Sequence, residues 1–184
     1  MKSRRTTKPR RPMTEAGALQ RLAALCAKAE HCSGEMDEKM IRWGLDADTR
    51  QRVLDKLIEL HYVDDERFCE SFVNDKIRFD RWGRRKIEQA LWQKKIPQEI
   101  AKKVLDPIDD KVYLDVLMPL LRSKWPSIKA NSDYERSLKL IRYGLSRGFS
   151  IDLIRQCIDR LGRELDGMDG DACDDSATTI GEDD

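Results

Sequence analysis

One unit recurs three times along this chain of 184 residues, at intervals of about fifty residues. In each copy a leading apolar residue is followed by further apolar residues four, eight and nine positions later. The leading residues are Leu45, Ile96 and Phe149, and only Thr49, four positions after the first of them, departs from the rule. The segments that introduce the copies are residues 41–45, 92–96 and 145–149. Recurrence at this length is typical of repeat proteins, whose stacked units build long partner-binding surfaces.

The spacing of apolar residues predicts helices throughout, and no stretch alternates as a strand would. Thr14 and Ser33 are typical N-caps, and the three acids at residues 64–66 suit the start of another helix better than a metal or acid–base site. Pro119 should kink its helix or end it early. We therefore predict an all-α fold, an elongated array of three tandem three-helix repeats that depend on their neighbours because each has a small core.

Charge and composition divide the chain into five parts. The predicted repeats cover residues 13–62, 63–107 and 108–162, separated where caps and breakers interrupt the helical pattern. Residues 1–12 carry six cations and no acid, and residues 163–184 carry nine acids and one arginine. Both segments contain too few apolar residues to form a buried core, so we expect a disordered basic arm and a disordered acidic tail. The tail could restrain a basic surface by competing for it.

Several classes of protein are disfavoured by what the sequence lacks. No apolar run is long enough to cross a membrane and no secretion signal is apparent, so a cytoplasmic protein is expected. The five cysteines form no CxxC pair, and Cys26, His31 and Cys32 lack a second ligand pair, so neither disulfides nor a metal site is expected. Neither histidine has a nucleophile or carboxylate at a recognised spacing, and no phosphate-binding loop is present. We expect no catalytic residue, no cofactor and no enzymatic activity.

The positive signal is a basic cluster in the middle repeat. Its candidate partner-binding residues are Arg78, Arg81, Arg84, Arg85, Lys86, Lys94 and Lys95. Interleaved acids leave open that part of the cluster is an ordinary solvated helix face. Arg84, Arg85 and Lys86, however, stand in the first turn of a helix, where the helix dipole disfavours cations by ~0.3–1 kcal/mol each. That local cost favours a role in binding phosphate or a carboxylate-rich protein surface.

The middle repeat also carries a family hallmark. Residues 62–73 read Tyr, Val, three acids, Arg, Phe, a small residue, Glu, Ser, Phe, Val, and Gly83 and Ile87 follow at a set distance. This pattern resembles the RecX regulatory proteins, with Cys69 standing where alanine is usual. The resemblance spans roughly residues 14–162 and is most specific in the middle repeat.

The resemblance implies a partner and a role. RecX-like proteins bind the filament of the RecA recombinase on single-stranded DNA and modulate its growth, its ATP hydrolysis and strand exchange, in DNA repair and recombination. By that analogy the chain would be a monomeric regulator that binds RecA, with single-stranded DNA as a further possible contact. The alternative is a helical DNA-binding protein acting without RecA, since the short turns between helices superficially resemble helix-turn-helix pairs. A hydrolase is the least favoured option, because no nucleophile–base pair is present.

Overall fold

The structure is a computed structural model that describes residues 13–170, with side chains described for residues 13–164. Across this range the protein consists of nine α-helices and one short 3-10 helix, without a strand. The all-α helical repeat prediction is confirmed. The predicted basic arm, residues 1–12, and residues 171–184 of the predicted tail lie outside the described residues.

The described helices belong to two compact units. The first contains the chain up to Asp80 and Ile87–Ile108, and the second contains Arg81–Lys86 and the chain from Asp109 onward. Unit 1 holds α1 (Glu15–Cys26), α2 (Ser33–Arg42), α3 (Ala47–Glu59), α4 (Asp65–Arg78), most of α5 (Arg84–Gln93) and α6 (Gln98–Leu105). Unit 2 holds α7 (Asp110–Lys124), the 3-10 helix (Trp125–Ser127), α8 (Asp133–Ser146) and α9 (Ile151–Gly170).

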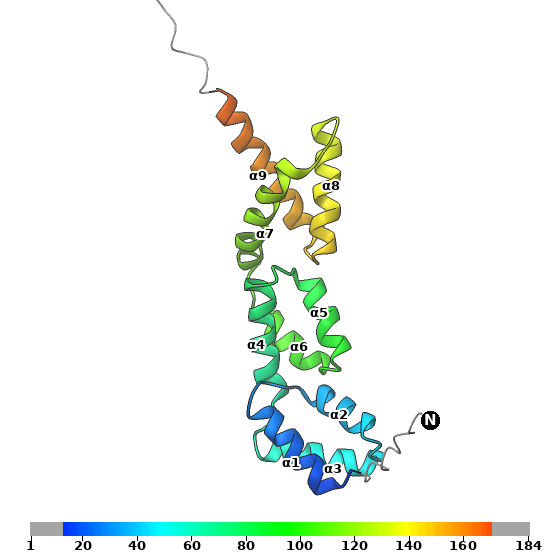
Figure 1. Ribbon diagram of the computed structural model, residues 1–184. Helices are drawn as coiled ribbons and strands as arrows, with labels where there is room; N and C mark the ends of the chain where they lie inside the picture. The colour runs from blue at the N-terminus through cyan, green and yellow to red at the C-terminus, as the bar shows by residue number, and fades with distance from the viewer. Residues whose placement is uncertain (1–12, 171–184) are drawn as a thin grey trace, which may run out of the picture. The chain divides into compact units, whose positions relative to one another are not determined.

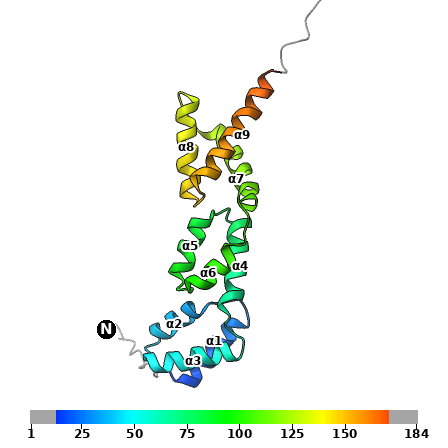
Figure 2. The same ribbon diagram turned by 180° about the vertical axis from the view of Figure 1, so that it is seen from behind.

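Each unit is built by packing helices side by side. In unit 1, α1 and α2 both pack on α3, and α4 lies beside α6 (Figure 1). In unit 2, α7, α8 and α9 pack on one another, and the view from behind shows the same grouping (Figure 2). None of the helices in the described part of the chain combines the length and apolar character needed to cross a bilayer. The finer division into repeats at residues 62/63 and 107/108 stays a prediction.

The recurring sequence unit is a recurring turn. Gly44, Lys95 and Gly148 all adopt left-handed backbone conformations, with φ of 81°, 61° and 88°. The leading apolar residue then donates its backbone N–H to the carbonyl five residues earlier. These bonds are Leu45 to Met40 at 3.2 Å, Ile96 to Leu91 at 3.1 Å and Phe149 to Gly144 at 3.2 Å. The same bond at the end of the middle helix of every repeat identifies a Schellman-type C-cap as the structural basis of the repeat.

The turns hold the helices together because their leading residues are buried. Leu45, Ile96 and Phe149 are 9%, 6% and 1% exposed. Leu45 joins an apolar cluster with Leu22, Met36 and Met40 in unit 1. Each turn therefore fixes the end of a middle helix to the core beneath it.

The acids at residues 64–66 have separate structural roles. Asp64 is the N-cap of α4 and accepts from the backbone N–H groups of Glu66 and Arg67 at 3.0 Å. Asp65 reaches back to α2, where its two oxygens accept from the backbone N–H and the hydroxyl of Ser33 at 2.7 and 2.6 Å. Glu66 forms an ion pair with Lys103 on α6. The interpretation of these acids as helix-start residues is confirmed for Asp64, which caps α4, while Asp65 and Glu66 lie in its first turn and contact other helices.

Two local predictions need correction. Ser33 is the first residue of α2 and not its N-cap, because the carboxylate of Asp65 supplies the cap from another helix while Cys32 occupies the N-cap position. The acidic tail was expected to start at residue 163, yet α9 continues to Gly170. An ion pair between Arg122 of α7 and Glu164 stabilises this extension.

Candidate partner-binding surface

The basic segment crosses from the end of α4 to the first turn of α5. Arg78 is the last residue of α4, Arg81 lies in the connection, and Arg84, Arg85 and Lys86 open α5. The connection belongs to unit 2, because the backbone N–H of Gly83 donates to the carbonyl of Arg147 at 2.8 Å. The N–H of Arg85 donates to the carbonyl of Gly148 at 3.1 Å. Residues 81–86 thus form a strap across the turn between α8 and α9.

Two glycines permit this approach. A Cβ on Gly83 would lie 2.3 Å from the backbone nitrogen of Phe149 and 2.4 Å from the carbonyl group of Gly148. A Cβ on Gly148 would lie 2.4–2.5 Å from Lys86 atoms. Gly83 of the family hallmark is therefore a packing residue, since only a hydrogen fits between the strap and the turn.

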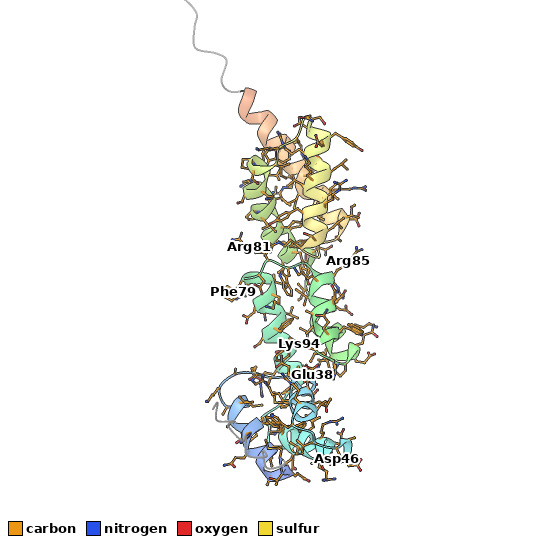
Figure 3. All side chains as sticks on the ribbon, turned by 45° about the vertical axis from the view of Figure 1, so that its right-hand side comes forward. Glu38, Asp46, Phe79, Arg81, Arg85 and Lys94 are labelled. Atoms are coloured by element: carbon orange, nitrogen blue, oxygen red, sulfur yellow. The ribbon has the colours of Figure 1, made fainter. Side chains whose placement is uncertain are left out.

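Three cations of the predicted set are exposed, and none forms an ion pair within residues 13–164. These are Arg78, Arg81 and Arg85. Arg81 also holds a left-handed φ of 54°, which a non-glycine residue adopts at a cost of about 1 kcal/mol or more. In Figure 3 Arg81 and Arg85 lie on opposite sides of the ribbon, so they do not form one flat patch.

Arg84 and Lys86 are half-buried and engaged with the protein itself. The Nζ of Lys86 lies 4.5 Å from the centre of the Trp82 ring, a cation–π distance. Their side chains contact the protein itself and are less exposed than those of Arg81 and Arg85. The sequence pattern grouped Arg78 with the four strap cations, whereas the structure separates the five by exposure.

Lys94 has internal contacts that give it a structural role, and its assignment as a partner contact stays a prediction. Its ammonium group pairs with Glu35 on α2 and lies 5.4 Å from the ring centres of both Phe68 and Phe72. Glu35 also accepts a 2.7 Å hydrogen bond from His31 Nδ1. Burial raises the pKa of the Glu35 carboxyl, but the hydrogen bonds from Lys94 and His31 outweigh it and hold that pKa below its ordinary value. The cluster joins α2 to α4 and α5.

Lys95, in contrast, remains half exposed. Its Nζ lies 3.8 Å from the carboxylate oxygens of Asp37 and Glu38, beyond hydrogen-bond length. It occupies the left-handed position that glycine holds in the other two repeats. Its left-handed backbone carries a strain that glycine would not.

One cation was not predicted from the sequence. Arg147 lies beside the strap, since its carbonyl accepts from Gly83, and its guanidinium lies 5.4 Å from the Tyr143 ring centre. The signal was available, because Arg147 stands in the third copy of the repeated turn. Together the strap and Arg147 provide a surface suited to anionic groups. Among the described residues no cluster of His, Cys, Asp or Glu could hold a metal ion.

Comparisons with known proteins show which family of proteins this chain is similar to. The family profile described as the second three-helix domain of RecX matches residues 64–105, and that of the third matches residues 111–158. The regulatory protein RecX of Prosthecochloris aestuarii is 31% identical over 78% of this chain and 93% of its own length. That of Clostridium perfringens is 30% identical over 69% of this chain, which spans 60% of that longer relative.

Solved structures agree on the fold. The crystal structure of RecX from Lactobacillus salivarius superposes with a TM-score of 0.73 at 22% identity, over 80% of this chain and 96% of the other. A second crystal structure of a regulatory protein RecX gives a TM-score of 0.72 at 20% identity, over 79% of this chain and 71% of the other. At these identities the likeness concerns the fold alone.

Proposed function

We propose that this chain, which belongs to the RecX family, binds the RecA filament on single-stranded DNA and limits its ATP hydrolysis and strand exchange. Membership makes it a regulatory protein of the RecX type; the RecA partner follows from the family resemblance. The proposal is carried by Arg81 and Arg85, the two exposed cations of the strap, and by the neighbouring Arg78, all in the profile-matched middle repeat. Cations without internal partners can bind carboxylates or phosphates without first breaking an ion pair.

The contacts are assigned to Arg78, Arg81 and Arg85, with Lys95 as a fourth. Arg81 and Arg85 extend to opposite sides of the strap (Figure 3), so they suit a partner that surrounds the segment better than a flat one. Arg84 and Lys86 support the strap from within.

The test is RecA's ATPase on single-stranded DNA, measured with this protein and with a variant carrying Arg78→Glu, Arg81→Glu and Arg85→Glu. We expect the concentration for half-inhibition to rise at least tenfold, since three contacts become repulsive. The control variant reverses Arg21, Lys28 and Lys111, which are also exposed, so the change in net charge is identical. Undiminished inhibition by the folded strap variant would remove these arginines from the interface.

The alternative, DNA binding without RecA, has one observation in its favour. Phe79 follows Arg78 directly and is 79% exposed (Figure 3). An exposed aromatic ring beside a cation is typical of surfaces that stack single-stranded bases. Fluorescence anisotropy with labelled single-stranded DNA and no RecA tests it, and Phe79→Ser should weaken that binding. Tight, salt-sensitive DNA binding with no effect on RecA would favour this alternative.

A further inference from the structure

The middle helix of each repeat exposes a large apolar side chain at the same position. Ile41 of α2, Trp92 of α5 and Leu145 of α8 are each the penultimate residue of their helix. They are 47%, 77% and 39% exposed. A single exposed apolar residue on a protein surface needs no explanation, but recurrence at one position in every repeat does.

The equivalence of the three positions rests on backbone geometry as well as on sequence. Each carbonyl accepts a hydrogen bond from the N–H of the left-handed residue three positions later. These bonds are Gly44 to Ile41 at 3.0 Å, Lys95 to Trp92 at 2.9 Å and Gly148 to Leu145 at 2.9 Å. The same turn therefore presents the same side-chain position three times, while the residue four positions later is buried beneath it.

The three positions also share a feature of the sequence. A cation follows each apolar residue within three positions: Arg42, Lys95 and Arg147. Beside Trp92 the surface is hollowed, with an open volume of ≈ 560 Å³ lined by Trp92, Gln93, Lys95 and Ile96. An apolar anchor with a neighbouring cation is the usual composition of a protein-binding hot spot with a charged rim.

Two chemical classes of partner can be separated here. Stacking on nucleobases needs aromatic rings, and two of the three anchors are aliphatic. Aliphatic side chains instead fill apolar pockets on proteins. A threefold recurrence further fits a partner that offers the same pocket repeatedly, as an assembly of identical subunits does.

From these observations we infer that Ile41, Trp92 and Leu145 are equivalent anchors for a protein partner built of identical subunits, each offering an apolar pocket rimmed by carboxylates. The inference rests on the proposed function, in which that partner is the RecA filament, and it makes the contact a protein–protein one that DNA does not supply. The adjacent cations would meet the carboxylate rim and set the orientation of each anchor.

Binding of the full chain to preformed RecA filaments tests the inference. The filaments are assembled on single-stranded DNA with a non-hydrolysable ATP analogue, and affinity is measured by biolayer interferometry. Ile41→Ser, Trp92→Ser and Leu145→Ser are compared singly and together with the unmodified chain. Each single change should weaken binding roughly tenfold, and the triple variant roughly a hundredfold or more.

Tyr134→Ser is the matched control, since Tyr134 is 74% exposed on α8 but does not occupy the repeated position. Circular dichroism confirms that each variant folds, and binding to single-stranded DNA alone should be unchanged in all of them. Filament binding by the folded triple variant within threefold of the unmodified chain would overturn the inference while leaving the proposed function intact. No filament binding by the unmodified chain would overturn the proposed function and this inference with it.

Discussion

Replacing Gly83 by alanine should unfold or severely weaken unit 2. The added Cβ would lie 2.3–2.4 Å from backbone atoms of Gly148 and Phe149, and backbone cannot rotate away as a flexible side chain could. The strap must therefore lift, which breaks the hydrogen bonds from Gly83 to Arg147 and from Arg85 to Gly148. Two such bonds contribute about 1 kcal/mol each, and overpacking adds about 1–3 kcal/mol. We expect a loss of roughly 3–5 kcal/mol, a large part of a typical domain's stability.

Urea denaturation followed by circular dichroism measures this loss. Because the damage falls on unit 2, the transition of Gly83→Ala should broaden or split, with α1–α3 unfolding later. Gly162→Ala in α9 is the control, since a Cβ there meets nothing within 4 Å. That control should gain about 0.5–1 kcal/mol from the better helix propensity of alanine. The packing argument fails if the free energy of unfolding of Gly83→Ala lies within about 0.5 kcal/mol of that of the unmodified chain.

Three further predictions concern Lys94, Lys95 and Glu35. Lys94→Met keeps the stem beside the phenylalanine rings but removes the partner of Glu35, and should cost about 1.5–3 kcal/mol in urea denaturation; an unchanged midpoint would contradict the structural role of Lys94. Lys95→Gly should stabilise the fold by about 0.5–1 kcal/mol by relieving the left-handed strain, and should at the same time weaken filament binding; a loss of stability would refute the strain argument. Because the pKa of Glu35 is lowered, the contribution of its carboxylate to folding stability is complete above the ordinary pKa of 4.5. That contribution is lost as the pH falls through the lowered pKa. Thermal unfolding between pH 3 and 7 should show this acid-side loss, and Glu35→Gln should reduce it; an identical pH profile for the variant would count against the cluster.

Local rules of helix formation made much of the fold predictable. Thr14 caps α1 as expected, its hydroxyl accepting from the N–H of Gly17. The recurring apolar spacing located the three turns, because a buried residue after a left-handed one is set by short-range geometry. Cys69 and Cys157, which lie at apolar helical positions, are buried.

The predictions that failed depended on contacts distant in sequence. Ser33 looked like an N-cap because its neighbours gave no sign of Asp65, whose carboxylate arrives from α4. Pro119 was expected to kink its helix or end it early. The early end is wrong, since α7 runs on to Lys124 with Leu117, Leu120 and Leu121 buried around the proline, and the kink stays a prediction. Burial of that apolar face outweighs one missing backbone hydrogen bond.

The location of the candidate site stays a prediction, and the sequence could not predict which of its cations are exposed. A cluster of cations in the sequence indicated residues 78–95. Only the structure distinguishes exposed Arg85 from half-buried Lys86, or the paired Lys94 from Lys95. Exposure depends on which helix covers which side chain, and a single sequence does not specify that. Arg147 was overlooked because its role comes from the strap that lies against its backbone.

The central claim is that this protein acts by binding another macromolecule, the RecA filament, through the strap and the repeated turns. Its most direct measurement is the rate of RecA's ATP hydrolysis on single-stranded DNA as this protein is titrated in. The account predicts that the rate falls with added protein. It also predicts that half-inhibition requires an at least tenfold higher concentration of the variant in which Arg78, Arg81 and Arg85 are reversed in charge. A rate that stays constant at saturating concentrations of the unmodified, folded chain would contradict it.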